Sequence, residues 1–266
     1  MMGVGMARYY ADREQARRRA RLRLVLSEVF GPTLQGEGPS IGRPAVFLRT
    51  GGCDLACSWC DTAYTWDWKG TSDAAKAQGA PFVAGDELHT LDPEQAAAEV
   101  LGRLRYGDRL VVSGGEPTLQ QPALAATLDL VREAWPRLWV EVETNATREP
   151  SPELDALVDR WTCSPKLAHS GDPEHRRLRP EALAAYAANS RSVWKLVVAH
   201  PDDLAHVDAL VDRYGIGAGA VWVMPLGTTV PKLDAGLAAI ADAVVARGYN
   251  LTPRLHVTAW GDERGR

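Results

Sequence analysis

The chain lacks the features that mark several common protein classes. Four cysteines among 266 residues argue against a disulfide scaffold, so we expect reduced thiols and a cytoplasmic location. We find no uninterrupted apolar run long enough to span a bilayer. A net charge of −4 gives no general attraction for nucleic acid, which favours a small substrate. Internal repeats and marked low-complexity tracts are also missing.

Length and composition fit one globular domain with a substantial core. We expect this domain over residues 25–266, after an arginine-rich extension over residues 1–24 that is helical or flexible. Asp12 and Glu14 interrupt the basic stretch, unlike a targeting peptide. A nucleic-acid-binding arm is the alternative to a solvated helix or frayed tail, and the solvated form is favoured.

Short apolar runs alternate with amphipathic segments along most of the chain. We expect strands at residues 45–49, 109–113, 138–143, 161–163, 193–198 and 220–224. We expect helices at residues 93–104, 122–135, 152–159, 180–189, 201–214 and 232–247. This order predicts an α/β fold with a parallel sheet, and periodicity alone does not decide between an open sheet and a closed barrel. Residues 63–90 fit the alternation poorly and are expected to form a long loop or insertion.

Polar and metal-binding residue types follow the ends of these strands. They are residues 53–61, 114–117, 144–145, 164–166 and 225–227. Because α/β folds place their chemistry at the carboxyl ends of parallel strands, we expect all of them at one edge of the sheet.

Three cysteines lie within eight residues, in the run Cys53-Asp-Leu-Ala-Cys57-Ser-Trp-Cys60. Three thiolates on one loop can converge on a metal centre with one ligand missing, and Fe–S clusters normally take four. A structural zinc site is the alternative, but it needs a fourth ligand and usually a second paired half-site. Cys163 lies in a strand-like run and is interpreted as a small buried hydrophobe.

The cysteine loop, followed by Ser113-Gly-Gly-Glu-Pro117 at a strand end, resembles the radical S-adenosylmethionine (SAM) enzymes. In that superfamily three cysteines hold a [4Fe–4S] cluster whose fourth iron is chelated by SAM. The resemblance implies a partial (β/α)6 barrel in a single domain. Glycines in the GGEP segment suit a close approach of the ligand, since they carry no Cβ.

A glycine-rich segment at residues 30–38, FGPTLQGEG, narrows the substrate. Together with Arg49 and Cys60-Asp61-Thr62 it resembles the 7-carboxy-7-deazaguanine synthases of queuosine and 7-deazapurine biosynthesis. The likeness continues through Glu143-Thr-Asn145, Ser164-Pro-Lys166 and Pro253-Arg-Leu-His256, and covers roughly residues 28–262.

That resemblance implies a set of site residues. Iron ligands would be Cys53, Cys57 and Cys60. SAM would be bound by Trp59, Asp61, Gly115, Glu116, Glu143, Asn145, Ser164, Pro165, Lys166, Met224, Pro225, Leu226 and Gly227. The substrate, 6-carboxy-tetrahydropterin, would be bound by Leu34, Gln35, Gly36, Glu37, Arg49, Ser113, Arg254 and His256. A guanidinium such as that of Arg49 can hold a carboxylate in a bidentate pair.

The same resemblance implies the reaction and its partners. A SAM-derived radical removes hydrogen from the pterin, the ring contracts, the rearranged radical regains hydrogen from 5′-deoxyadenosine, and ammonia is lost, so SAM is recycled. No protein acid or base is assigned. Thr62 would be an oxygen ligand of Mg²⁺, although a helix N-cap is an equal interpretation of that residue. An external electron donor of the flavodoxin or ferredoxin type and a homodimer are further expectations; nucleic acid and membrane partners are not expected.

Two departures from the family pattern stand out. Ala146 occupies a position where the family often has glycine after Glu-Thr-Asn, and the chain ends in Trp260-Gly-Asp-Glu-Arg-Gly-Arg266, so no contact of the terminal carboxylate is carried over. Two rival functions stay open. One is an activase of glycyl-radical enzymes, which acts on a protein. The other is a non-enzymatic Fe–S or zinc module that carries electrons or binds nucleic acid.

Overall fold

The computed structural model describes residue 14, residue 19, residues 21–104 and residues 109–266. The N-terminal extension predicted over residues 1–24 therefore lies largely outside the described residues. Of its arginines, Arg19 is described, and its guanidinium lies 2.5 Å from the Asp129 carboxylate.

Nine strands form one sheet in the order β3-β1-β2-β4-β5-β6-β7-β8-β9. The six predicted strands are all present and are consecutive parallel neighbours. They are β2 (Pro44–Thr50), β4 (Arg109–Gly114), β5 (Trp139–Thr144), β6 (Arg160–Cys163), β7 (Ser192–Val198) and β8 (Val221–Pro225). The prediction of a single-domain α/β fold of the partial-barrel type is confirmed.

Three strands were not predicted. They are β1 (Leu24–Leu34), β3 (His89–Leu91) and β9 (Asn250–Leu251). β1 pairs antiparallel with β2 and β3 at one edge of the sheet, and β9 pairs parallel with β8 at the other. The first half of the glycine-rich segment at residues 30–38 therefore lies in a strand, because β1 runs through Leu34.

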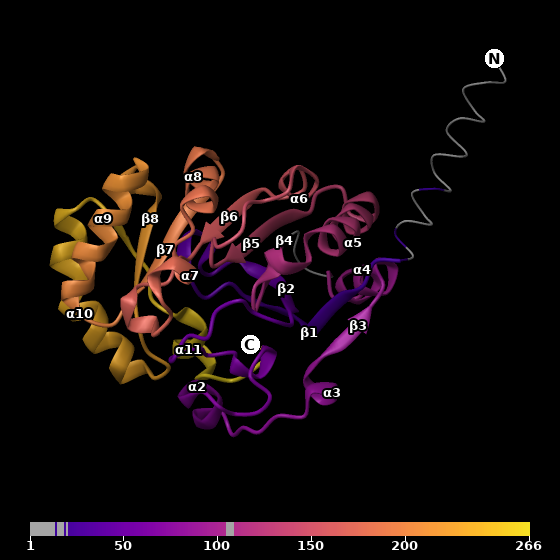
Figure 1. The fold of residues 1–266 in the computed structure, drawn as a ribbon, viewed down its shortest axis with the longest axis horizontal. Helices are drawn as coiled ribbons and strands as arrows, with labels where there is room; N and C mark the ends of the chain where they lie inside the picture. The colour runs from indigo at the N-terminus through magenta and orange to yellow at the C-terminus, as the bar shows by residue number, and fades with distance from the viewer. Residues whose placement is uncertain (1–13, 15–18, 20, 105–108) are drawn as a thin grey trace, which may run out of the picture.

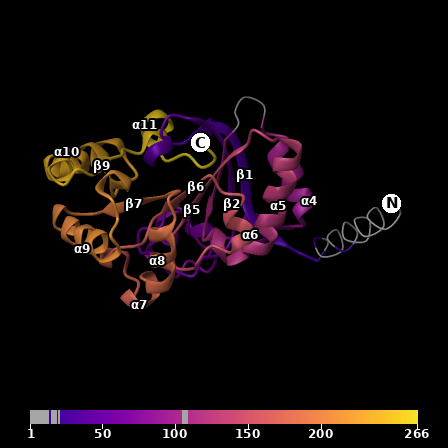
Figure 2. The same ribbon diagram turned by 90° about the horizontal axis from the view of Figure 1, so that it is seen from above.

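Helices cover the outer face of the sheet (Figures 1 and 2). The predicted ones appear as α4 (Pro93–Leu101), α5 (Gln121–Ala134), α6 (Pro152–Asp155), α8 (Pro180–Ala188), α9 (Leu204–Tyr214) and α10 (Val230–Ala246). Several start with proline, and α4 has a capping box between Asp92 and Gln95. Three predicted helices differ by three or more residues. α4 ends at Leu101 rather than at residue 104, α6 ends at Asp155 rather than at residue 159, and residues 201–214 divide into a 3-10 turn, η5 (Pro201–Asp203), and α9. No helix among the described residues is both long and apolar enough to cross a membrane.

Alternation along the strands separates the core from the site. In β5, Val140 and Val142 are fully buried in the main core with Leu124 and Leu128 of α5. The intervening Glu141 and Glu143 therefore point to the inner face of the sheet. The polar side chains needed for chemistry thus gather inside the curved sheet, and the apolar ones hold the helices outside.

Residues 63–90 form short elements rather than one long loop. These are η2 (Ala63–Thr65), α2 (Asp73–Ala77) and α3 (Ala84–Glu87). The Asp67 carboxylate stabilises the turn between η2 and α2, because it accepts hydrogen bonds from the backbone N–H groups of Gly70, Thr71 and Ser72. In Figure 1, α2, α3, α11 (Leu255–Trp260) and the C-terminus lie together on one side of the sheet. The remaining short elements are η1 (Gly38–Ser40), η3 (Pro117–Gln120), η4 (Ala168–Ser170), α7 (Glu174–Arg177) and η6 (Ala218–Ala220).

Candidate functional site

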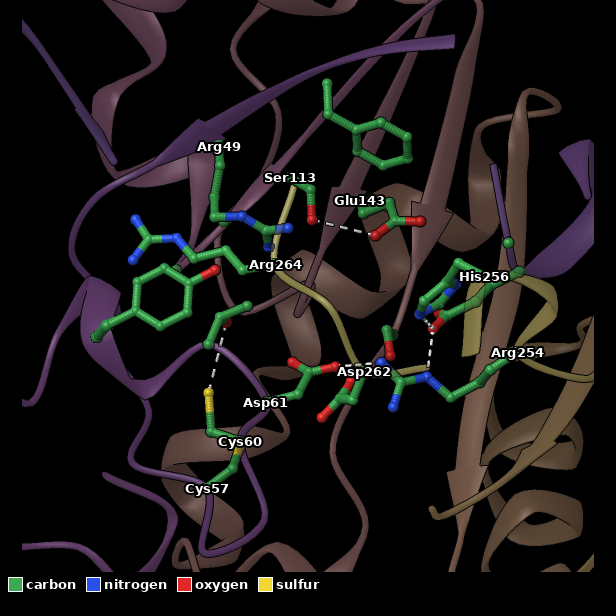
Figure 3. A pocket seen from close by; sticks show the side chains of 18 of the residues that line it. Arg49, Cys57, Cys60, Asp61, Ser113, Glu143, Arg254, His256, Asp262 and Arg264 are labelled. Atoms are coloured by element: carbon green, nitrogen blue, oxygen red, sulfur yellow. Dashed lines mark hydrogen bonds and ion pairs between the residues drawn. The ribbon is translucent and has the colours of Figure 1, made fainter. Parts of the chain in front are cut away.

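A cavity of about 680 Å³ opens at the carboxyl ends of the parallel strands. The three clustered cysteines, the Leu34–Glu37 segment, Arg49 and the last residues of the chain all line it. Figure 3 shows Cys57 and Cys60 on one side, Arg49, Ser113 and Glu143 on another, and Arg254 and His256 opposite. Motifs separated by about 200 residues therefore meet at one place, as the strand-end argument predicted.

Most of the predicted site residues line this cavity. They are Leu34, Gln35, Gly36, Glu37, Arg49, Cys53, Cys57, Trp59, Cys60, Asp61, Thr62, Ser113, Gly115, Glu143, Asn145, Ser164, Lys166, Met224, Arg254 and His256. Five predicted SAM-binding residues are not among the lining residues: Glu116, Pro165, Pro225, Leu226 and Gly227. Their assigned contacts stay predictions, and for Glu116 the geometry indicates a different task.

The cysteine loop is held by polar contacts from two neighbouring segments. Both oxygens of Asp172, a buried residue, accept the backbone N–H of Ala56 at 3.1 Å. The Asp54 carboxylate accepts hydrogen bonds from Asn145 Nδ2 at 2.9 Å and from Thr147 Oγ1 at 2.8 Å. These contacts fix the loop to the turn after β5 and to the segment after η4, so the thiols are positioned without any disulfide.

The three thiols fit an Fe–S cluster better than a single ion. Among the described residues, no three His, Cys, Asp or Glu side chains converge closely enough to hold one metal ion. A four-iron cluster is wider, since each thiolate binds a different iron. Burial raises the pKa of Cys57 to about 12 and raises the pKa of Cys53 and Cys60, so binding iron must displace their protons. Trp66 Nε1 donates to Cys60 Sγ at 3.4 Å, a contact that stabilises a thiolate.

Cys163 takes no part in this cavity. It lies in β6, fully buried in the main core, as its apolar surroundings predicted. A cluster held by the other three cysteines therefore has no fourth cysteine ligand from the described part of the chain.

The glycines of the GGEP segment are required by the chain itself. A Cβ on Gly115 would lie 1.9 Å from the carbonyl oxygen of Gly52, and one on Gly114, whose φ is +134°, would lie 2.3 Å from the backbone of Thr50. The backbone N–H of Glu116 donates to that same Gly52 oxygen at 2.8 Å. The end of β4 is thus packed directly against the start of the cysteine loop.

Glu116 lies beneath the cavity and is fully buried. Its carboxylate accepts hydrogen bonds from Thr118 N and Oγ1, from Thr144 Oγ1 and from Asn145 N. Burial raises the pKa of Glu116, against these hydrogen bonds. The carboxylate therefore connects the turn after β4 to the turn after β5.

Ala146 has a backbone conformation that glycine normally adopts. Its φ is +60°, the one positive value for a non-glycine residue among the described residues, and its side chain is fully buried. The departure from the family pattern at this position leaves the turn in its glycine-like form.

One side of the cavity carries aromatic and basic groups suited to a nucleoside. The Trp59 ring lies 5.4 Å from the His169 ring, and its buried Nε1–H has no hydrogen-bond partner among the residues that the structure describes. Lys166 Nζ lies 5.7 Å from the Trp59 ring and donates to Ser164 Oγ at 3.0 Å. A buried indole N–H without a partner fits a bound group that supplies an acceptor.

The opposite side is built around the Gln35–Glu37 loop. Gln35 Nε2 donates to Glu143 Oε1 at 2.9 Å, and Ser113 Oγ donates to Glu143 Oε2 at 3.1 Å. Arg254 donates from Nε to Glu37 Oε1 at 2.9 Å and from Nη2 to Asp61 Oδ2 at 2.6 Å. The C-terminal Arg254 therefore connects the loop after β1 to the loop after β2.

Burial and neighbouring charges act against each other on these groups. Burial alone would raise the pKa of Glu37, but Lys195, Arg254 and His256 together lower it. Burial lowers the pKa of His256, despite the attraction of Glu37. Glu37 is thus a carboxylate and His256 a neutral ring at neutral pH.

Arg49 enters the cavity from β2 with its charge held in place. Its Nε donates to Glu28 Oε1 at 2.8 Å, and its guanidinium lies 5.3 Å from the Phe30 ring. Burial would lower the pKa of Arg49, but Tyr64, Glu28 and Asp61 raise it. The cation stays charged and the rest of its guanidinium edge faces the cavity (Figure 3).

Thr62 lies beside the cysteines. It is the N-cap residue of η2 by position, as the alternative interpretation had it, but its side chain makes no capping hydrogen bond. Its Oγ1 lies 3.6 Å from Cys60 Sγ, and Thr62 is one of the residues that line the cavity.

Two parts of the site were missed by the sequence analysis. One is Lys195 in β7, which lies 2.5 Å from Glu37 Oε2; a lysine within the apolar run VWKLVV was the available signal. The other is the tail at residues 262–266, which lines the cavity. Arg264 lies 4.0 Å from the Tyr64 ring and donates to Glu87 Oε2 at 2.7 Å and to Glu28 Oε2 at 3.2 Å. No sequence pattern marked that tail.

The sequence and the fold of this chain are similar to those of known enzymes. The model of the radical SAM superfamily matches residues 47–186. The chain is 37% identical over 244 residues to the 7-carboxy-7-deazaguanine synthase of Pyrobaculum aerophilum, covering 92% of this chain and 98% of that protein. It is 34% identical over 260 residues to the Halobacterium salinarum enzyme of the same name, covering 90% and 91%. The crystal structure of QueE from Escherichia coli matches with a TM-score of 0.64 at 24% identity, over 90% of this chain and 96% of that one, and supports the fold.

Proposed function

The chain belongs to the 7-carboxy-7-deazaguanine synthases of the radical SAM superfamily, and from that premise we propose how its cavity divides between cofactor and substrate. The protein is a radical SAM lyase of queuosine and 7-deazapurine biosynthesis. The curated relatives carry the synthase name, so the activase and the non-enzymatic module are set aside. One observation supports the division most: the cysteine loop and the Gln35–Glu37 loop, which carry the predicted cofactor and substrate motifs, line one cavity.

Cys53, Cys57 and Cys60 would hold the [4Fe–4S] cluster that the superfamily implies. When bound, the reduced cluster and SAM supply the radical that starts the ring contraction. Asp172 and Asp54 hold the loop in which the three thiols lie. The chain's contribution at this end of the cavity is to fix the three sulfur atoms and to leave one iron without a protein ligand.

SAM would occupy the side that carries Trp59, Ser164 and Lys166. The unpartnered indole N–H and the charged Lys166 offer donors to a nucleoside and a carboxylate. Asn145 and Met224 line the same region, and Gly115 presents backbone there. Glu116, in this proposal, fixes the two turns rather than touching the ligand, because its oxygens are already occupied by four donors of the chain.

The substrate, 6-carboxy-tetrahydropterin, would occupy the side that carries Gln35, Glu37 and Glu143. Glu143 was predicted from the sequence to bind SAM, and we assign it to the substrate instead because its carboxylate is held by Gln35 and Ser113. A pterin presents adjacent N–H donors and a carbonyl oxygen along its pyrimidine edge, which carboxylate and amide groups can match. Arg49 would pair with the substrate carboxylate in a bidentate contact. Both ends of the substrate would then be held, with the carboxylate-bearing carbon between them.

Mg²⁺ would be bound through Thr62. Thr62 lines the cavity together with Asp61, and its hydroxyl makes no capping bond. Magnesium usually keeps several waters and takes few protein ligands, so a single hydroxyl together with substrate oxygens is sufficient. The ion would lie at the boundary between the two subsites.

An acidic electron-carrier protein of the flavodoxin or ferredoxin type would reduce the cluster. Ala56 and Ser58, on the cysteine loop, are exposed. Two exposed arginines flank them: Arg176 donates to the Asp54 carbonyl oxygen at 2.6 Å, and Arg148 lies 3.6 Å from the Asp54 carboxylate. A cysteine loop with two exposed residues and two flanking arginines favours docking of a negatively charged partner. The homodimer stays a prediction. So does the boundary between the extension over residues 1–24 and the domain over residues 25–266.

The function is tested by anaerobic turnover of reconstituted, reduced protein with SAM, Mg²⁺ and 6-carboxy-tetrahydropterin, with products identified by mass spectrometry. Formation of 7-carboxy-7-deazaguanine with release of ammonia is expected. The variant Cys163→Ala is the matched control, and it should keep its iron content and its activity, whereas Cys60→Ala should lose both. Cleavage of SAM with an unchanged pterin would contradict the substrate assignment.

A further inference from the structure

Lys195 lies in the middle of β7 and is only 5% exposed. Its side chain lines the cavity from the inner face of the sheet. The Nζ atom lies 2.5 Å from Glu37 Oε2 and 3.3 Å from Glu143 Oε1. Burying an ammonium is costly unless it is paired and hydrogen-bonded, so two carboxylates at this distance account for its presence in an apolar strand.

Proton transfer is not what this ammonium is suited for. Burial would lower the pKa of Lys195, but Glu143 and Glu37 outweigh burial and raise it. A group that stays charged throughout the neutral range is a poor general acid or base. Any effect of Lys195 on the reaction must therefore act through the carboxylates that it holds.

The two carboxylates come from different parts of the fold. Glu37 lies in the loop after β1, and Glu143 lies in β5. Glu143 is also held by Gln35 and Ser113, and Glu37 by Arg254. Among the described residues, Lys195 is the cation that contacts both carboxylates.

We infer that Lys195 is a positioning residue for the known reaction, which fixes Glu37 and Glu143 as a pair of acceptors for the N–H edge of the substrate. The inference rests on the proposed pterin subsite and adds a residue to it. Acceptors that are already in place bind a planar donor edge without ordering side chains first, and this favours affinity. Without the ammonium, two carboxylates would share a buried site with one fewer cation and would move apart or rotate toward water.

The test measures binding rather than turnover. Dissociation constants for 6-carboxy-tetrahydropterin and for SAM are measured separately by calorimetry under anaerobic conditions, on cluster-loaded protein without reductant. Lys195→Met is compared with Lys76→Met, a lysine of α2 whose ion pair with Asp73 is exposed. Glu37→Gln and the double variant E37Q/K195M complete a cycle, and Lys195→Gln is used if Lys195→Met does not take up iron.

Lys195→Met is expected to weaken pterin binding by about 10- to 100-fold, the range for losing contacts to charged groups. SAM binding should change by less than about twofold, Lys76→Met should behave as wild type, and the loss should be smaller in the Glu37→Gln background. A wild-type pterin affinity in Lys195→Met, or in Lys195→Gln where that variant is used, would overturn the inference alone. So would an equal loss of SAM and pterin affinity. Failure of the wild-type protein to bind the pterin would overturn the proposed subsite as well.

Discussion

Gly36 and His256 are packed so closely that a Cβ on Gly36 would lie 1.9 Å from Nδ1 of His256. The contact is reinforced by a hydrogen bond from the Leu255 backbone N–H to the Gly36 carbonyl oxygen at 2.8 Å. The glycine of the LQGEG segment is therefore needed so that the C-terminal residues can reach the cavity.

Gly36→Ala is predicted to separate the Gln35–Glu37 loop from α11. Forcing a methyl into this contact should cost about 1–3 kcal/mol of folding stability and weaken pterin binding by at least about tenfold. Thermal unfolding and pterin titration measure the two effects. Gly85→Ala is the control, because a Cβ on Gly85 would meet nothing within 4 Å. Normal pterin affinity in Gly36→Ala would contradict the packing argument.

Arg49 is predicted to select for the substrate carboxylate. Wild-type protein should bind 6-carboxy-tetrahydropterin about 10- to 100-fold more tightly than tetrahydropterin, which lacks the carboxylate. Arg49→Met should bind both compounds equally, and Arg49→Lys should recover only part of the preference, since lysine offers no bidentate edge. Arg103→Met, which alters an exposed pair with Glu99, is the control. A preference that survives in Arg49→Met would exclude this role.

Thr62 is predicted to set the dependence on Mg²⁺. Thr62→Ala should raise the Mg²⁺ concentration needed for half-maximal activity by about tenfold, whereas Thr62→Ser keeps the hydroxyl and should stay close to wild type. Iron content and SAM affinity should not change in either variant. Identical Mg²⁺ titrations for alanine and serine would place the ion elsewhere.

Arg148 and Arg176 are predicted to affect the rate of cluster reduction only when a protein, rather than a small chemical reductant, supplies the electron. With reduced flavodoxin, the double variant R148E/R176E should reduce its cluster about tenfold more slowly than wild type, and added salt should narrow the difference. With dithionite the two proteins should be equal. Arg213→Glu on α9 is the control. Equal rates with flavodoxin would show that this partner docks on another face.

Ala146 is predicted to tolerate glycine unusually well. Removing a buried methyl costs about 0.8 kcal/mol, but releasing an alanine from φ +60° returns about 1 kcal/mol. Ala123→Gly, at a buried position in α5, loses its methyl and about 1 kcal/mol of helix propensity with no such relief. Denaturant unfolding of cluster-free protein should therefore show Ala146→Gly near wild type and Ala123→Gly clearly destabilised. Equal losses would contradict the strain assigned to Ala146.

The sequence pattern predicted the strands and helices that show a clear periodicity or apolar run of their own. The six central strands are short apolar runs, and their order alone implied a parallel sheet with its chemistry at one edge. β1 was missed because its register against β2 is irregular between Phe30 and Thr33, so no clean alternation marks it. β9 has two residues, too few to show any period.

Cavity residues that belong to a recognisable motif were predicted from the sequence. Residues that reach the cavity because distant segments meet there were missed. The cysteines, Arg49 and the LQGEG segment each stand in a recognisable run. Lys195 gains its meaning only from Glu37 and Glu143, which the curved sheet brings to it. Arg264 likewise reaches Tyr64 and Glu28 only through the path of the tail. Such pairings depend on tertiary structure and correspond to no regular spacing of residues in the sequence.

The most direct test of the central claim, that SAM and the pterin share one cavity, is transfer of a label between them. Reduced protein is given SAM and 6-carboxy-tetrahydropterin deuterated at the carbon that bears the carboxylate, and the recovered SAM and any released 5′-deoxyadenosine are examined by mass spectrometry. Ring contraction with loss of ammonia is redox-neutral and returns hydrogen from 5′-deoxyadenosine, so adjacent subsites predict deuterium at the 5′ carbon of the recovered SAM together with 7-carboxy-7-deazaguanine. Unlabelled 5′-deoxyadenosine, formed while the pterin is left intact, would contradict the arrangement.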